Sequence, residues 1–226
     1  ELADLAAFLN RMGASVIGAG GSTVTIEGGE RLHPVDHTVI PDRLEAATFL
    51  TALAVTGGEL VLEAARPAHM DMLMTKLGDM GMRTSSHPDG VWAAAPERLR
   101  AVDINSLPYP GIATDYLPLM VAALAVADGA SIATENIFGG RFRYVDELVR
   151  MGADIRVEHH YAVIRGVERL SGAPVRAHDI RAGAALAVAA LGAEGETVIS
   201  DAEHIARGYD RFVEKLRAVG ADVDAD

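Results

Sequence analysis

Acidic side chains stand where three long apolar runs of the sequence begin. Asp42, Asp115 and Asp179 each lie one or two residues before such a run. An Asp at a helix start accepts hydrogen bonds from backbone N–H groups that have no partner within the helix, a role worth about 1 kcal/mol. Helix capping is therefore the ordinary interpretation of all three acids, and the sequence leaves open whether Asp115 does more.

Arginines gather at the same junctions. Arg43 and Arg181 follow two of these acids closely, and Arg207 precedes a run that is expected to form a helix from about residue 208. A cation near a helix N-terminus is disfavoured by about 0.3–1 kcal/mol, because the positive end of the helix dipole lies there. A bound phosphate or carboxylate would offset this cost. Neutralisation by the neighbouring acids is the alternative, and it accounts well for Arg43 but less well for Arg207.

A repeated unit must position these groups. Gly13, Gly81, Gly152 and Gly220 follow amphipathic, helix-like runs and are separated by 68, 71 and 68 positions. Glycine commonly ends a helix because it adopts left-handed backbone angles without strain, so each run is expected to be a surface helix. Arg141 interrupts the repeat at a register that the other units fill with apolar side chains, which adds to the indication of an anion site.

The three apolar runs form a second class of helix. They span residues 43–55, 116–127 and 181–191, and each is followed by a turn containing glycine and a short strand. A helix that is apolar on all sides is buried. The expected unit is therefore strand, buried helix, strand, surface helix and two more strands (βαβαββ), in an α/β fold whose sheets lie outside a bundle of internal helices.

Composition narrows the class of partner. The chain has 20 Lys and Arg against 32 Asp and Glu, and its net charge of -12 disfavours binding to nucleic acid or to an anionic membrane surface. The longest apolar stretch, 116–127, is too short to span a membrane, and the absence of cysteine favours the cytoplasm. The eight histidines lack metal-type spacing and are expected at solvated or edge-strand positions, so no metal site is predicted. "GAGGS" at residues 18–22 is interpreted as a hairpin turn.

Segments throughout the chain resemble the family of UDP-N-acetylglucosamine enolpyruvyl transferases. The segments that carry the resemblance are "HTVIPDRLEAATFL", "PYPGIATD", "TENIFGGRFRYVDELVRMGADI", "VERLSGAPVRAHDIRAGAALAVAAL" and "HIARGYDRFVEKLRAVGADV". The resemblance implies an inside-out α/β barrel of repeated βαβαββ units, with buried helices and sheets outside. It also implies that residues 1–36 end a second domain and that residues 37–226 form the main part of the first, catalytic-cleft domain.

The resemblance implies a reaction as well. Members of the family transfer the enolpyruvyl group of phosphoenolpyruvate to the 3′-hydroxyl of UDP-N-acetylglucosamine and release phosphate, without a cofactor, in the first committed step of peptidoglycan synthesis. Asp115 matches the acid that takes the proton of that hydroxyl, which an ordinary Asp does only with a raised pKa or as the new bond forms. The other implied substrate-binding positions are Asp42, Ile137, Arg141, Asp179, Arg181 and Arg207.

The chain begins at Glu1 without Met, and the resemblance covers the C-terminal half and more of the family. We therefore expect a piece of a longer enzyme, inactive alone, whose missing N-terminal half carries a Lys-Asn pair and a loop with Cys or Asp. A shikimate 3-phosphate enolpyruvyl transferase shares the architecture and stays open. So does a non-catalytic paralogue that keeps the anion site, although Asp115 and Arg207, whose loss would mark it, are both present. An RNA-processing cyclase of similar topology conflicts with the net charge.

Overall fold

The computed structural model describes residues 1–29 and 31–225 and divides the chain into two compact units. Unit 1 comprises Glu1–Asp42, and unit 2 begins at Arg43. The domain boundary expected from the sequence, between residues 36 and 37, lies in the irregular segment that leads into unit 2.

Unit 1 is a helix followed by a hairpin. Its elements are α1 (Leu2–Arg11), β1 (Ser15–Ile17) and β2 (Thr25–Glu27). Asn10 ties the helix to the hairpin, because its Nδ2 donates to the Val16 carbonyl at 2.8 Å and its Oδ1 accepts from the Val16 N–H at 2.7 Å. The segment 18–22 joins the two antiparallel strands, so the predicted hairpin turn is confirmed.

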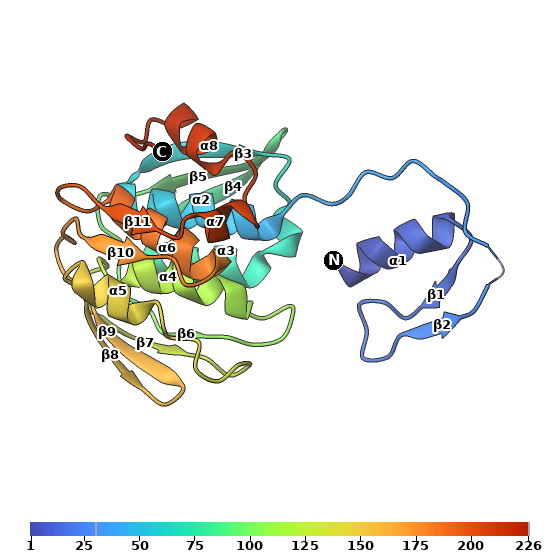
Figure 1. Cartoon of the computed structure of the whole chain (residues 1–226), viewed down its shortest axis with the longest axis horizontal. Coiled ribbons are helices and arrows are strands. Elements are labelled where there is room, and N and C mark those ends of the chain that lie inside the picture. Colours follow the sequence, from blue (N-terminus) through green and yellow to red (C-terminus); the bar gives the residue numbers. More distant parts are fainter. Residues whose placement is uncertain (30, 226) are drawn as a thin grey trace. The chain divides into compact units, whose positions relative to one another are not determined.

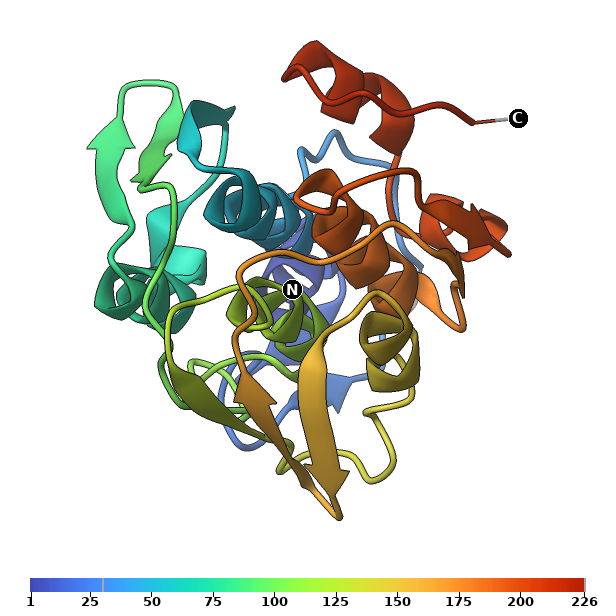
Figure 2. The same cartoon turned by 90° about the vertical axis from the view of Figure 1, so that its left-hand side faces the viewer.

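Three buried helices form the core of unit 2. They are α2 (Arg43–Thr56), α4 (Leu117–Leu124) and α6 (Ile180–Leu191). Every residue of α4 is buried, and α2 buries the whole of 46–54. Helix α4 packs on α6, and α2 packs on both; the three helices lie together inside the unit in Figure 1 and are seen nearly end-on in Figure 2. The Thr48 and Thr51 hydroxyls donate back to carbonyls of α2 at 2.9 Å, so both buried hydroxyls are satisfied.

Sheets surround these helices. The first, with strand order β3-β5-β4, is wholly antiparallel; the second, with order β6-β7-β9-β8, is antiparallel except for the parallel pair β6–β7; and β10 and β11 form a short parallel pair. The strands are β3 (Gly58–Glu63), β4 (Arg83–His87), β5 (Gly90–Ala95), β6 (Ile104–Asn105), β7 (Ala130–Thr134), β8 (Asp154–Glu158), β9 (Tyr161–Arg165), β10 (Pro174–Arg176) and β11 (Val198–Ser200). Buried helices with sheets outside are therefore confirmed.

The order β6–α4–β7–α5–β8–β9 reproduces the predicted βαβαββ unit. The remaining helical elements of unit 2 are η1 (Pro67–His69), α3 (Asp71–Met80), η2 (Thr114–Tyr116), α5 (Val145–Arg150), α7 (Glu203–Ala206) and α8 (Phe212–Ala218). Helix α3 ends at Gly81 in the left-handed region (φ 108°), which only glycine adopts without strain, and the glycines after α1, α5 and α8 also have positive φ. The four glycines thus end the surface helices as predicted.

Candidate anion-binding site

A cavity of about 300 Å³ lies in unit 2 where the start of α6 meets the end of α7 and the residues before α4 and α5. Three arginines and two aspartates line it, a formal balance of +1 in a chain of net charge -12. The lining residues are Asp115, Arg141, His178, Asp179, Ile180, Arg181, His204 and Arg207. A positive cavity in an acidic protein favours a small anion.

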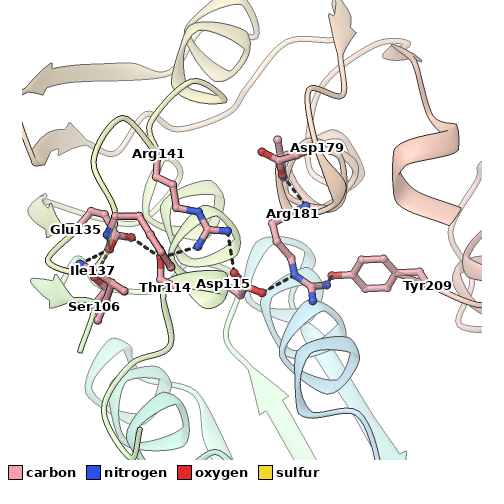
Figure 3. Close-up of polar contacts among 11 residues, drawn as sticks. Ser106, Thr114, Asp115, Glu135, Ile137, Arg141, Asp179, Arg181 and Tyr209 are labelled. Atoms are coloured by element: carbon pink, nitrogen blue, oxygen red, sulfur yellow. Dashed lines mark hydrogen bonds and ion pairs between the residues drawn. The ribbon is translucent and has the colours of Figure 1, made fainter. Parts of the chain in front are cut away.

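Asp115 does not cap a helix. It lies in the 3₁₀ turn η2, whose N-cap is Ala113, and no side chain caps α4. Its carboxylate instead bridges two arginines: Oδ1 accepts from Arg141 Nη2 at 2.8 Å, and Oδ2 accepts from Arg181 Nε at 3.1 Å (Figure 3). The capping interpretation is wrong for this residue, because a 3₁₀ turn precedes the helix and turns the carboxylate toward the guanidinium groups.

The pKa of Asp115 is lowered from its ordinary value. Partial burial acts to raise it, but the hydrogen bonds and positive charges of Arg141 and Arg181 outweigh burial. The side chains of Asp115, Arg141 and Arg181 are 31%, 30% and 15% exposed, so these are half-sheltered ion pairs. The carboxylate is therefore ionised at neutral pH.

Asp179 is the helix cap that the sequence predicts. Its Oδ1 accepts from the N–H groups of Arg181 and Ala182, each at 2.8 Å, at the first turn of α6. Arg181 is held further by Tyr209, whose hydroxyl accepts from Nη1 at 3.3 Å and whose ring centroid lies 5.6 Å from the guanidinium carbon. The Tyr209 hydroxyl also bonds to Thr48 of α2 at 2.8 Å. The Arg181 cation at this helix terminus is thus held by Asp115 and Tyr209, and Thr48 holds Tyr209 in turn.

Arg207 lines the cavity, but not from the position expected. The predicted helix from residue 208 is absent; α7 ends at Ala206, Arg207 follows it, and α8 begins only at Phe212. The C-terminal end of a helix favours a cation, so the argument from an unfavourable dipole does not apply to Arg207. Gly208 lets the backbone after α7 pass close to Ile180 of α6, because a Cβ at position 208 would lie 2.6 Å from Cγ2 of Ile180.

Two predicted residues are not among those that line the cavity. Ile137 lies in the loop after β7, and its N–H donates to the Glu135 carboxylate at 2.7 Å. Asp42 is the last residue of unit 1, so the structure does not place it relative to the cavity. The structure does bring together Asp115, Arg141, Asp179, Arg181 and Arg207.

Sequence reasoning missed several neighbours of this cavity. His178 and His204 line it, and neither was singled out from the sequence; His178 is exposed to solvent, as expected of the histidines. Thr114 accepts from Arg141 Nη1 at 2.7 Å and donates to Glu135 at 2.6 Å (Figure 3). Thr114 and Glu135 each stand within two positions of a residue singled out from the sequence, but no spacing pattern predicts that these two side chains meet.

Across residues 1–29 and 31–225, no group of three or more His, Cys, Asp or Glu side chains is placed to hold a metal ion. Among the helices of that same part of the chain, none is both long and apolar enough to cross a bilayer.

Residues 1–216 match the sequence model of the family described as EPSP synthase (3-phosphoshikimate 1-carboxyvinyltransferase). The chain is 50% identical over 224 residues to UDP-N-acetylglucosamine 1-carboxyvinyltransferase 2 of Caldanaerobacter subterraneus subsp. tengcongensis, covering 99% of this chain and 54% of the relative. It is 51% identical to UDP-N-acetylglucosamine 1-carboxyvinyltransferase 1 of Symbiobacterium thermophilum, covering 99% of this chain and 51% of that protein. The chain thus spans about half the length of the curated relatives that it matches.

Solved structures show the same relationship. The enolpyruvyl transferase NikO from Streptomyces tendae superposes with a TM-score of 0.85 at 31% identity, covering 97% of this chain and 53% of that one. EPSP synthase from Acinetobacter baumannii superposes with a TM-score of 0.73 at 21% identity, over 97% of this chain and 54% of that one, and shows a shared fold alone.

Proposed function

The chain belongs to the EPSP synthase (3-phosphoshikimate 1-carboxyvinyltransferase) family, and we propose that it supplies the Asp115 site of an enzyme that transfers the enolpyruvyl group of phosphoenolpyruvate to the 3′-hydroxyl of UDP-N-acetylglucosamine. The observation that carries the proposal is a carboxylate whose two oxygens are held by different arginines in a basic cavity. A proton acceptor beside paired guanidinium groups suits the addition of a hydroxyl to a phosphorylated acid.

The reaction needs Asp115 to accept the proton of the sugar hydroxyl as its oxygen adds to C2 of phosphoenolpyruvate and C3 gains a proton. Loss of a proton from C3, with cleavage of the C–O bond to phosphate, then restores the double bond. The lowered pKa of Asp115 makes it a weak base. This argues against a raised pKa at rest and favours proton transfer that is concerted with bond formation. The substrate phosphate and carboxylate compete with Asp115 for Arg141 and Arg181. As the arginines turn toward the substrate, Asp115 loses the contacts that lower its pKa and becomes a better base.

Arg207 and the start of α6 complete the proposed anion site. The Arg207 guanidinium lines the same cavity, and its charge-assisted contact to phosphoenolpyruvate strengthens as the site closes. Asp179 keeps Arg181 at the helix N-terminus. Ile137 is proposed to contact the nucleotide sugar through its backbone, and Asp42 is proposed as a further substrate-binding residue.

The nucleotide sugar is favoured over shikimate 3-phosphate as acceptor. The relatives named for the UDP-sugar reaction are 50% and 51% identical to the chain, whereas the superposed EPSP synthase is 21% identical. A non-catalytic paralogue that only binds anions is the second candidate, and turnover decides between them.

We further propose that residues 1–36 belong to the end of a second domain and residues 37–226 to the main part of the first. The separate compact unit before Arg43 supports this division. A cytoplasmic role in peptidoglycan synthesis, and so in cell shape, the cell cycle and division, is part of the same proposal, as is a requirement for a further N-terminal half.

The test is turnover by the complete gene product, with phosphate release and product mass as the measurements. Phosphoenolpyruvate with UDP-N-acetylglucosamine is expected to yield the enolpyruvyl ether, and shikimate 3-phosphate to yield none. In the same assay Asp115→Asn should remove most turnover and leave UDP-sugar affinity within about tenfold. Turnover with shikimate 3-phosphate alone would reverse the choice of acceptor, and none with either acceptor would favour the non-catalytic paralogue.

A further inference from the structure

Glu135 is a buried acid next to the candidate site that does not line the cavity. It directly follows β7 and is 3% exposed. Its Oε1 accepts from the Ser106 hydroxyl at 2.7 Å and from the N–H groups of Ile137 and Phe138 at 2.7 and 3.1 Å, and its Oε2 accepts from the Thr114 hydroxyl at 2.6 Å. Among the described residues no Lys or Arg forms an ion pair with it. Four hydrogen bonds alone satisfy this carboxylate.

The hydroxyl of Thr114 passes the influence of Glu135 to Arg141. A guanidinium has only donors, so the Thr114 oxygen must accept from Arg141 Nη1, at 2.7 Å. The Thr114 proton is then left for Glu135, which is an acceptor when ionised. Burial acts to raise the pKa of Glu135, but its four hydrogen bonds lower the pKa below the ordinary value, so it is ionised at neutral pH.

Glu135 also holds Phe138, a second residue that contacts the Arg141 guanidinium. The Arg141 guanidinium carbon lies 5.3 Å from the ring centroid of Phe138, whose N–H is bonded to Glu135. One buried carboxylate thus anchors two groups that contact Arg141, the Thr114 hydroxyl and Phe138. Figure 3 shows the resulting line of contacts from Glu135 through Thr114 and Arg141 to Asp115.

We propose that Glu135 is a positioning residue of this site: by orienting Thr114 and the backbone of Ile137 and Phe138, it holds Arg141 against Asp115. The expected effect of Glu135 on turnover rests on the proposed function, whereas its effect on the position of Arg141 depends only on the folded chain. A purely structural role is the competing explanation, because Ser106 and Asn136 also join this network, Asn136 through its N–H to the Ser106 hydroxyl at 2.8 Å.

The first test follows Asp115 directly and needs no activity. Carboxyl titration by NMR on this chain should show a higher pKa of Asp115, closer to its ordinary value, in both Glu135→Gln and Thr114→Val, because each substitution releases Arg141. Thr51→Ala removes a buried hydroxyl whose partners among the described residues all lie within α2. It serves as the matched control for lost stability, with the Asp115 titration unchanged. Thr114→Val stays informative if Glu135→Gln fails to fold. An Asp115 pKa that is unchanged or lower in Thr114→Val would overturn the proposal.

The second test uses kinetics of the complete gene product. Glu135→Gln and Thr114→Val should each lower kcat/KM by about tenfold or more, because Arg141 is then no longer placed to bind the substrate anion, and should shift the acid limb of the pH profile toward higher pH. Thr51→Ala should stay within about twofold. The double variant should lose no more than the worse single variant, because both act through Arg141. Additive losses would overturn the proposal. If the wild type shows no turnover, the proposed function fails, and the Asp115 titration still decides the positioning role.

Discussion

Replacing Asp115 with Asn should weaken the fold and strengthen anion binding at the same time. The carboxylate is the counter-charge of two guanidinium groups, at 2.8 Å from Arg141 and 3.1 Å from Arg181. An Asn side chain can accept from only one of them and turns its NH₂ donor toward the other. Because all three side chains are partly exposed, we expect a loss of about 1–2 kcal/mol of unfolding free energy rather than the larger cost of a deeply buried pair.

The gain in anion affinity follows from the charge of the cavity. Three arginines and two aspartates line it, so the substitution changes the formal balance from +1 to +2. A carboxylate about 5 Å from a phosphate dianion repels it by about 2–3 kcal/mol at an effective dielectric constant of about 40–80. Salt screening reduces this figure, so inorganic phosphate should bind about tenfold tighter or better to Asp115→Asn.

Isothermal titration of inorganic phosphate into this chain, with urea unfolding in parallel, measures both effects. The matched control is Asp128→Asn, because Asp128 is 76% exposed, lies outside the cavity and reaches Arg98 only at 4.0 Å. The control should change neither quantity. Phosphate affinity that is unchanged or weaker in Asp115→Asn would refute the view that Asp115 and a substrate anion compete for the same arginines.

Three further predictions concern Asp115, Tyr144 and Arg207. The lowered pKa of Asp115 means that its carboxylate stabilises the fold above the ordinary carboxyl pKa and stops doing so as pH falls through the lowered value. The unfolding free energies of wild type and Asp115→Asn should therefore converge as pH falls below the ordinary carboxyl pKa, and a constant difference in urea unfolding would contradict this. Tyr144→Phe should leave stability unchanged or raise it by up to about 1 kcal/mol, because the buried Tyr144 hydroxyl has no hydrogen-bond partner among the described residues; a clear loss in thermal unfolding would show that the hydroxyl is satisfied. Arg207→Ala in the complete gene product should raise KM for phosphoenolpyruvate at least about tenfold with little change for the nucleotide sugar, and equal effects on both substrates would count against its assignment.

The local pattern of the sequence was enough to predict the architecture. Helices that are apolar on every side have to be buried, and amphipathic helices that end at regularly spaced glycines have to cover a surface. These rules act over a few residues, which is why α2, α4 and α6 were placed correctly and why the repeat predicted the order of elements around α4. The cap at Asp179 followed from the same short-range chemistry.

Local rules failed where a short turn changed the direction of the chain. Asp115 has the position of a helix cap in the sequence, but the 3₁₀ turn η2 takes its place at the helix start. Arg207 was expected at the start of a helix and instead follows the end of α7. Both errors concern one turn of backbone, a scale at which propensities compete closely and packing decides.

The sequence by itself determined the repeat, the buried and surface helices, the family resemblance and the set of acids and arginines able to handle an anion. Only the tertiary structure decided which of them meet. Asp115 contacts Arg141 and Arg181 from 26 and 66 positions away in the chain, and Glu135 reaches Thr114 across 21. Such contacts depend on how α4, α6 and β7 pack, because packing of whole elements, and not local spacing, sets the distance between side chains remote in sequence.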